Sequence, residues 1–298
     1  MNILKPLIYF SLFNHPLTEE EAFQFSKAST KSSLRKEVDI LIQSGIIKKV
    51  DEFLLYKKDP TNITKRVTGN KNANAVMPKA KKMASFISKF PFVEGVGISG
   101  SLSKGYYDAE SDFDFFVITK ARKVWLTRTL IAFYKRIFLH NSYKEFCVNY
   151  YVSTETLEIE EKNRFTATEI ITVIPLYGKE VFEDFYKENQ WVTDYFPNYT
   201  LLSNLKKTYP IIKSKNRQVF EFLLTNFIGR SINYLCMKFI TRRWKQKYKS
   251  KVNSPYKSKK EISKHHPENF QDKVIKKLNL QYKYCLEEYG IHIPEEHV

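Results

Sequence analysis

The stretch Gly97-Ile-Ser-Gly-Ser-Leu-Ser-Lys-Gly-Tyr-Tyr-Asp-Ala-Glu-Ser-Asp-Phe-Asp-Phe-Phe-Val-Ile-Thr119 constrains the fold more than any other part of the chain. Its pattern predicts a strand over Val93 to Ser99, a tight Gly-Ser turn into a short helix or loop, and a second strand over Asp112 to Thr119. Asp112 and Asp114 stand at the start of that second strand. Because side chains two apart on a strand point to the same face, the two carboxylates are expected side by side.

This carboxylate pair requires a positive partner, since two neighbouring carboxylates raise each other's pKa unless a cation neutralises them. Oxygen ligands without His or Cys nearby suit Mg²⁺ or Mn²⁺, and Mg²⁺ is usually held by one or two carboxylates together with substrate phosphates. A triphosphate is therefore the expected ligand. Gly100 has no Cβ to obstruct a phosphate, Ser101 offers a hydroxyl donor, and a helix starting there would add free N–H groups.

Gly100-Ser101, ten intervening residues and then Asp112-Phe113-Asp114-Phe115 resemble the signature of the DNA polymerase β-type nucleotidyltransferases. The resemblance implies transfer of a nucleoside monophosphate from a nucleoside triphosphate to a hydroxyl or similar acceptor, with release of pyrophosphate. On this basis Asp112 and Asp114 are expected to bind Mg²⁺ or Mn²⁺ and to act in catalysis. Gly100, Ser101 and Lys104 are expected to bind the nucleotide.

The third carboxylate of that family is missing at the expected place. It often projects from the next strand, and here the predicted strand over residues 146–152 offers Asn149, which contributes no charge. Three alternatives remain open: Glu145 or a later residue such as Glu169 supplies the carboxylate, one metal ion suffices, or catalysis is lost while nucleotide binding persists. Glu169 falls in a predicted helix, where an ordinary surface or capping role is the competing interpretation.

The remaining patterns predict an α+β protein of three units joined by one linker. Residues 1–57 resemble a winged helix-turn-helix, with Lys31, Arg35 and Lys36 on its candidate recognition helix over 33–43. DNA reading, protein docking and substrate positioning all remain open for it. A linker over 58–75, a nucleotidyltransferase domain with a mixed sheet over 76–197 and a helical C-terminal domain over 198–298 follow.

Two aromatic or basic segments bear on nucleic-acid binding. Residues 182–196 form an aromatic-rich helical stretch that is more typical of a core than of a base-stacking platform. Residues 242–264 hold ten Lys or Arg against Glu261 alone. With Trp244, Tyr248 and Tyr256 interleaved, this basic segment suits either a nucleic-acid surface or a solvated loop. Just before it, residues 219–243 predict one long buried helix.

The net charge of +17 suits an anionic partner such as nucleic acid, nucleotide or an acidic membrane surface, and a bias in composition is the competing explanation. Three Cys without metal spacing, at Cys147, Cys236 and Cys285, indicate a reducing cytoplasm and no zinc site. The most apolar segment contains Glu221, Arg230 and Lys238, so neither a membrane span nor a membrane partner is expected. The oligomeric state stays open.

A metal-dependent nucleotidyltransferase with an unidentified acceptor is the function that these features favour. The alternative is a catalytically impaired nucleotide sensor or DNA-binding regulator. An antitoxin-like or antibiotic-modifying enzyme is a third interpretation. The sequence does not select among tRNA, a protein hydroxyl, a sugar or a drug as acceptor.

Overall fold

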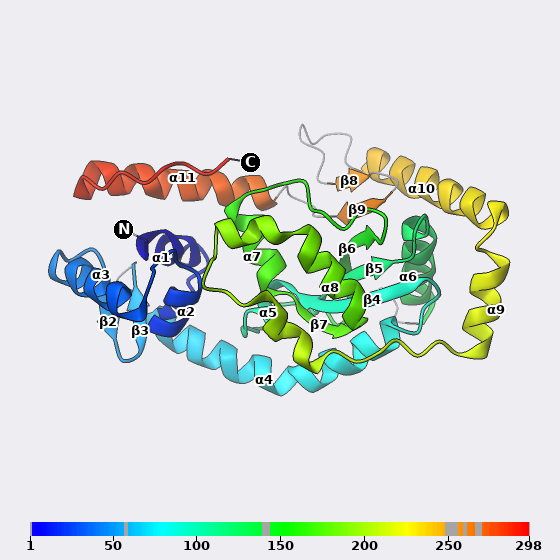
Figure 1. The fold of residues 1–298 in the computed structure, drawn as a ribbon, viewed down its shortest axis with the longest axis horizontal. Coiled ribbons are helices and arrows are strands. Elements are labelled where there is room, and N and C mark those ends of the chain that lie inside the picture. Colours follow the sequence, from blue (N-terminus) through cyan, green and yellow to red (C-terminus); the bar gives the residue numbers. More distant parts are fainter. Residues whose placement is uncertain are drawn as a thin grey trace.

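The computed structural model describes residues 2–56, 59–138, 144–247, 256–258, 261–265 and 270–297 of the 298-residue chain, and the side chains of 256–258, 264 and 265 are outside the description. The elements are spread along one long axis (Figure 1). The N-terminal helices and strands lie at one end together with the last helix of the chain, a sheet with its covering helices lies in the middle, and the two helices within residues 215–247 lie at the far end.

The N-terminal unit consists of three helices and a three-stranded antiparallel sheet with the order β1-β3-β2. Its elements are α1 (Leu4–Ser11), β1 (Leu17–Thr18), α2 (Glu19–Gln24), α3 (Lys31–Gln43), β2 (Lys48–Val50) and β3 (Phe53–Leu55). The side chains and backbone of Thr18 and Glu21 form a reciprocal capping box at α2, and a cap of this kind typically stabilises a helix start by about 1 kcal/mol. The winged-helix interpretation of this unit stays a prediction.

The linker predicted over 58–75 is wrong, because α4 (Thr61–Ile87) runs through it as a continuous helix. Small and polar residues form its buried face, namely Asn62, Arg66, Gly69, Ala73, Ala80, Ala84 and Ile87. They recur at helical spacing, but a face with so few large apolar side chains gives no hydrophobic periodicity in the sequence. At Gly69 an added Cβ would lie 2.3 Å from the Tyr106 ring. This helix therefore packs closely against the loop that contains Tyr106.

A six-stranded mixed sheet forms the centre of the molecule, with the order β7-β4-β5-β6-β9-β8. The strands are β4 (Val93–Ser99), β5 (Asp114–Thr119), β6 (Cys147–Ser153), β7 (Ile174–Tyr177), β8 (Tyr256–Ser258) and β9 (Ile262–His265). Neighbouring strands are antiparallel except β5 and β6, which are parallel and need a crossover. That crossover is α6 (Val124–Phe138).

The two faces of the sheet are covered by different helices. Phe116 and Ile118 of β5 face a core shared with α7 (Arg164–Thr172) and α8 (Lys179–Glu188). Phe115 and Val117 face the opposite core, shared with α4 and α6. In the aromatic stretch, Phe182, Phe185, Val192 and Phe196 are buried, which confirms the prediction that it belongs to a core.

The long helix predicted over 219–243 is wrong, because the chain breaks it into α9 (Lys215–Leu223) and α10 (Phe227–Lys247). The break is held by two interactions: Lys123 donates to the carbonyl of Leu224, and Asn226 accepts from the Gly229 N–H at 3.3 Å. After α10, β9 pairs with β6. The predicted all-helical C-terminal unit therefore also supplies strands to the central sheet.

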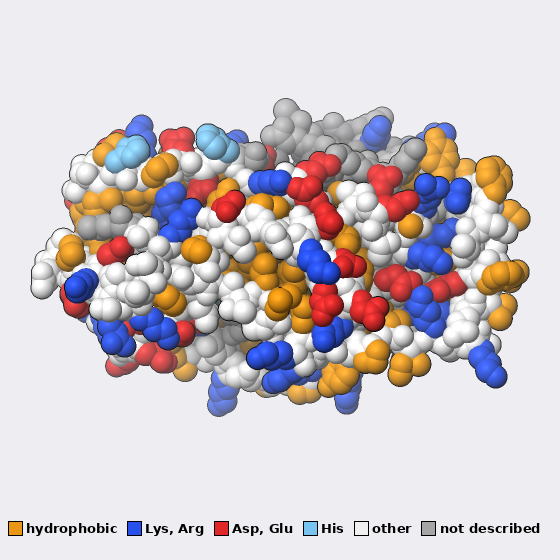
Figure 2. Space-filling model, in the orientation of Figure 1, with side chains coloured by type: hydrophobic (Ala, Val, Ile, Leu, Met, Phe, Trp, Pro, Cys, Tyr) orange, Lys and Arg blue, Asp and Glu red, His pale blue; other side chains and the backbone are white. Residues whose placement is uncertain are grey.

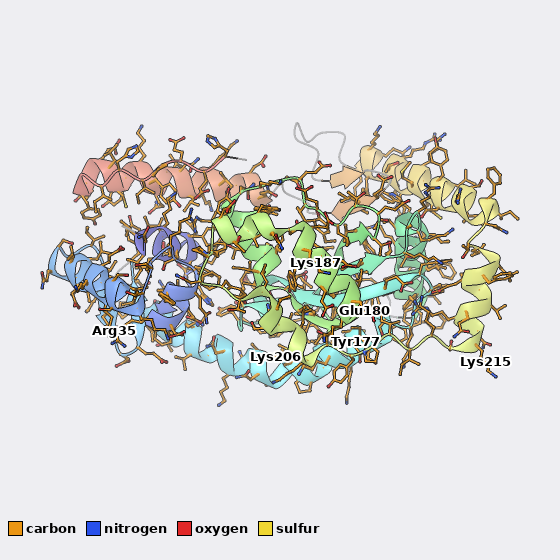
Figure 3. The ribbon with its side chains drawn as sticks, in the orientation of Figure 1. Arg35, Tyr177, Glu180, Lys187, Lys206 and Lys215 are labelled. Carbon is orange, nitrogen blue, oxygen red and sulfur yellow. The ribbon has the colours of Figure 1, made fainter. Side chains whose placement is uncertain are left out.

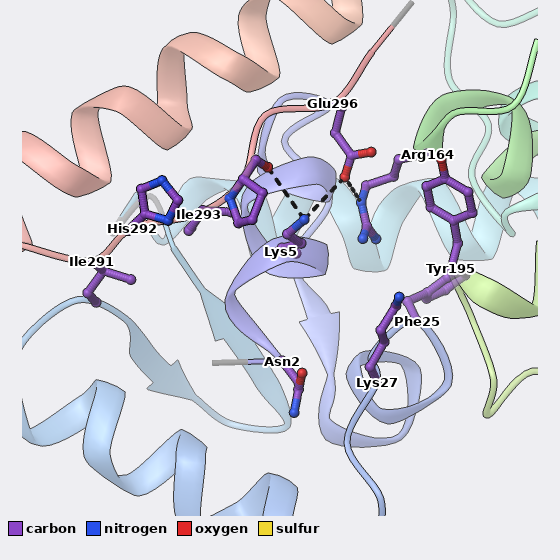
Figure 4. Close-up of a pocket in the computed structure, with 11 residues that line it drawn as sticks. Asn2, Lys5, Phe25, Lys27, Arg164, Tyr195, Ile291, His292, Ile293 and Glu296 are labelled. Carbon is purple, nitrogen blue, oxygen red and sulfur yellow. Dashed lines mark hydrogen bonds and ion pairs between the residues drawn. The ribbon is translucent and has the colours of Figure 1, made fainter.

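The last helix, α11 (Phe270–Tyr289), is followed by a returning segment that ends beside α1 and α7 (Figures 1 and 4). Glu296 accepts a hydrogen bond from Arg164 Nε at 2.9 Å and forms an ion pair with Lys5 at 3.6 Å. A pocket of about 290 Å³ lies around this contact. Glu296 supplies negative charge to the buried Arg164 guanidinium and to the partly exposed Lys5 ammonium, so the contact anchors the end of the described chain.

Among the described residues, no helix is long and apolar enough to cross a membrane.

Candidate active site

Gly100 joins β4 to the short helix α5 (Gly100–Ser103) in a conformation that favours glycine, with a φ of +67°. A Cβ at this position would lie 2.3 Å from Asp114 Oδ2. The sequence predicts that this glycine lets a phosphate approach the backbone. The structure adds a second reason for it, because a side chain here would displace the carboxylate of Asp114.

The α5 helix brings two further predicted residues toward Asp114. No side chain caps its first turn, and with four residues its dipole is small. Ser101 is half-buried at the start of α5. The Lys104 ammonium donates to the Gly100 carbonyl at 3.1 Å and forms an ion pair with Glu169 at 2.8 Å. Lys104 is therefore oriented by the turn that it follows.

Asp112 lies in the loop before β5 rather than on the strand, because β5 begins at Asp114. Asp108, which is not among the residues predicted from the sequence, stabilises this loop. Its carboxylate accepts from Ser111 Oγ at 2.8 Å, from the Glu110 N–H at 3.0 Å and from the Tyr106 hydroxyl at 3.0 Å. Asp followed three residues later by Ser is a turn signal that local sequence reasoning can detect.

The Asp114 carboxylate carries poorly compensated negative charge. Burial, then the charges of Asp112 and Glu169, raise the pKa of Asp114 to about 7, and the Lys104 ammonium opposes them. Asp112 therefore lies close enough to Asp114 for the two negative charges to repel each other. A cation or a positive ligand placed here would stabilise the ionised form of Asp114.

Asn149 on β6 contacts Asp114 directly. Its Nδ2 donates to Asp114 Oδ1 at 2.8 Å, and its Oδ1 accepts from the Cys147 thiol at 3.2 Å. A bulge positions it, since Phe115 pairs with Val148 while Phe116 pairs with Tyr150. Burial raises the pKa of Cys147 to about 12, so the thiol stays protonated and able to donate.

The two alternative carboxylates differ in position. Glu145 is partly exposed and forms an ion pair with Lys79, and its charge is not among the main causes of the shifted Asp114 pKa. Glu169 on α7 lies close enough to Asp114 to raise its pKa and is bonded to Lys104. The helix predicted around Glu169 is confirmed, and this residue joins the site from a distant part of the chain.

The donor set can be compared with the needs of a divalent cation. Among the described residues, no three His, Cys, Asp or Glu side chains come together as metal ligands. Asp112 and Asp114 supply two hard oxygen donors with excess negative charge, which fits an ion that completes its coordination with phosphate oxygens and water. The residues present therefore fit a two-carboxylate site and do not provide a three-carboxylate one.

The features predicted for nucleic-acid binding are only partly described. Trp244 is buried, with its ring 5.9 Å from that of Trp125 and the Arg128 guanidinium 4.7 Å from its centre, so its role as a stacking platform is wrong. Tyr248 and most of the basic segment lie outside the described residues, as does the Tyr256 side chain.

The cations of α3 are largely engaged within the N-terminal unit. Lys31 forms an ion pair with Glu20 at 2.5 Å, and Arg35 (Figure 3) forms one with Glu19 at 3.5 Å. Glu19 also pairs with Lys49 at 2.5 Å. These carboxylates lower the positive potential that a DNA-reading helix would need.

Comparison with known proteins gave one match: residues 79–195 fit the family model described as a nucleotidyltransferase domain. No curated protein and no solved structure matched the chain. The matched segment contains the Gly100 turn, both aspartates, Asn149 and Glu169. The domain at residues 79–195 thus supports membership of the polymerase β-type nucleotidyltransferase superfamily and, in general terms, a nucleotidyl transfer enzyme.

Proposed function

We propose that this protein is a metal-dependent nucleotidyltransferase that moves a nucleoside monophosphate from a nucleoside triphosphate to a hydroxyl acceptor. The observation that carries the proposal is the contact of the Gly100 turn with Asp114, whose pKa is raised to about 7 by burial and by Asp112 and Glu169. A half-buried carboxylate pair beside a turn without side-chain caps is arranged for a cation and an anionic ligand together.

Each residue has a role in this proposal. The Gly100 N–H and the Ser101 hydroxyl donate to the β- and γ-phosphates, and Lys104 adds positive charge beside them. Asp112 and Asp114 hold Mg²⁺ or Mn²⁺, which when bound supplies neutralising charge and favours loss of the acceptor proton. Asn149 fixes the rotamer of Asp114 by donating to its Oδ1. Glu169 orients Lys104 through their ion pair.

Positioning and charge neutralisation dominate such a reaction, so the aspartates are its most sensitive residues. We expect Asp112→Asn and Asp114→Asn each to lower turnover by about a hundredfold or more, on the scale of electrostatic catalysis. The measurement is release of pyrophosphate with each labelled triphosphate in the presence of Mg²⁺ or Mn²⁺. Label recovered in the RNA, protein or small-molecule fraction of a cell extract identifies the acceptor class.

The exposed Asp184→Asn is the matched control, because it removes a carboxylate from α8 far from the turn and should leave turnover unchanged. Turnover that survives in both site variants would contradict the assignment of Asp112 and Asp114. Triphosphate binding without transfer in the unaltered protein would instead support the nucleotide-sensing alternative, which Asn149 in place of a carboxylate favours.

A further inference from the structure

The far end of the molecule exposes an apolar surface formed by α9 and α10, which we call the α9–α10 face. Its exposed members are Phe222 (80%), Leu223 (59%), Phe227 (80%), Ile228 (60%), Leu235 (63%) and Phe239 (67%). Figure 2 shows apolar side chains projecting along this margin of the molecule. Single exposed apolar residues are ordinary, but a contiguous group of this kind marks an interaction surface.

The α10 helix has two distinct faces. One packs on α6, where Gly229, Asn233 and Trp244 are buried. The other is a stripe of Ile228, Ile232, Leu235 and Phe239, spaced by four, three and four residues, and its exposed members contact no other part of the described fold closely enough to be covered. Only the first face is needed to attach α10 to the sheet. The second is available for a partner.

The charges around this stripe all have one sign. From Phe222 to Lys260 the sequence contains no Asp or Glu. Arg230, Lys238, Arg242, Arg243 and Lys245 lie on α10, and they form no ion pair with the residues that the structure describes. The basic residues concentrate toward the end of the helix, beside Phe239. The partner is therefore both apolar and negatively charged.

We infer that the α9–α10 face docks on the surface of an anionic phospholipid membrane. Helices that lie in a membrane interface combine exposed Phe, Leu and Ile with flanking Lys and Arg, as this face does. A second copy fits less well, because a symmetric interface would bring the same uncompensated cations together. This contact is peripheral and requires no spanning helix, and it revises the expectation that the protein has no membrane partner.

The α9–α10 face lies away from the candidate active site. In Figure 1, α5 lies at the end of the central sheet nearer to the N-terminal unit, whereas α9 and α10 lie at the far end of the molecule. Docking through this face would hold the protein at the lipid surface without covering the turn. The inference does not depend on which acceptor the enzyme uses.

The test measures sedimentation of the full chain with vesicles of phosphatidylcholine alone and of equal parts phosphatidylcholine and phosphatidylglycerol. We expect binding to the anionic vesicles only, weakening as salt rises. A triple variant, Phe222→Ser, Phe227→Ser and Phe239→Ser, should lower the partition coefficient by more than about tenfold. The double variant Arg242→Glu and Arg243→Glu should lower it by at least about tenfold as well.

Two matched controls distinguish binding through the α9–α10 face from the effect of removing any exposed apolar side chain or reversing any pair of charges. Leu280→Ser removes an apolar side chain that is 65% exposed on α11, and Lys276→Glu with Lys277→Glu changes the net charge as the α10 reversal does. Both should keep binding within about twofold of the unaltered protein. Thermal unfolding of every variant confirms that each one is folded.

Three outcomes would overturn the inference. The first is equal binding to neutral and anionic vesicles, or binding to neither. The second is equal loss in the α10 and α11 charge reversals, which would indicate attraction by net charge alone. The third is a dimer in solution that dissociates in the triple variant while vesicle binding is absent, which would assign the face to a second copy of the chain.

Discussion

Gly100 satisfies two requirements at one position, a positive φ and contact with the Asp114 carboxylate. Gly100→Ala should therefore abolish nucleotidyl transfer, because its Cβ would lie where Asp114 Oδ2 now lies. The matched control is Gly105→Ala, which has a similar φ of +70° and no atom within 4 Å of its Cβ. Both variants should lose about 1 kcal/mol of stability from the strained backbone. Equal activities in the pyrophosphate assay would contradict this role of Gly100.

His15 makes stability depend on pH at the junction of the N-terminal unit and α4. It accepts a hydrogen bond from Arg66 at 2.9 Å through Nδ1, and burial, then the charges of Arg66 and Lys104, hold its pKa well below the usual value. The folded protein therefore binds this proton less readily than the unfolded chain does. The stability that the neutral ring contributes is complete above about pH 6.5 and is lost as the pH falls below that value.

Urea unfolding of the protein and of His15→Gln, followed from about pH 8 to about pH 5, tests this point. The free energy of unfolding of the unaltered protein should fall more steeply toward acid than that of the variant, because Gln cannot take up a proton. The other five His residues are common to both proteins and cancel in the comparison. A difference between the two that does not change with pH would rule His15 out as the cause.

At the scale of elements, α9 is attached to the start of β4 by one buried ion pair. Arg217 donates to the carbonyls of Ser88 and Val93 at 2.6 Å each and to Glu221 Oε1 at 2.6 Å. Glu221 Oε1 in turn accepts from the Phe92 N–H at 2.7 Å. Arg217→Ala would remove the donor to the Ser88 and Val93 carbonyls and would leave the buried Glu221 carboxylate with Lys213, 3.4 Å away, as its ionic partner.

We expect that substitution to lower the free energy of unfolding by about 3–5 kcal/mol. The control is Lys215→Ala on the same helix, where the exposed side chain (Figure 3) should contribute less than about 0.5 kcal/mol. Chemical denaturation of both variants measures the two losses. Similar small losses would mean that α9 is held mainly by other contacts.

The elements also show where sequence patterns succeed. β4 and α6 follow from strong apolar runs, and the bounds of β4 are those predicted. Sequence patterns do not reveal the part of α4 before Met77, because its buried residues are Asn62, Arg66, Gly69 and Ala73, which give no hydrophobic periodicity. The break between α9 and α10 was missed because it depends on Lys123, a residue about a hundred positions earlier. Tertiary contacts decide such cases, and no local pattern records them.

In the candidate site, too, some residues can be predicted from the sequence and others depend on tertiary contacts. The Gly100 turn and the two aspartates follow one another closely, so their spacing in the sequence was enough to propose them. The place of Asn149 depends on a bulge between β5 and β6, and that of Glu169 depends on how α7 packs against α5. Both residues are candidates from the sequence, but no local pattern distinguishes them from Glu145. Their roles remain proposals for the activity assay.

At the scale of the whole molecule, segments from the two ends of the chain contact each other, which three successive independent units would not do. The returning segment after α11 reaches α1 through Glu296 and Lys5, and Tyr56 lies 3.1 Å from the Cys285 thiol. The N-terminal unit and the sheet also share buried residues of one core. Sequence periodicity finds individual helices and strands, but it does not indicate which distant ones will meet.

The pairing of β9 with β6 has a consequence for biosynthesis. β6 ends at Ser153, while the strand that covers its open edge begins only at Ile262. During translation the backbone of β6 therefore stays unpaired on that side until most of the polypeptide has been synthesised. An uncovered strand of this kind invites pairing with another chain. The nascent protein should consequently depend on ribosome-associated chaperones, and slow synthesis of the intervening segment should favour aggregation.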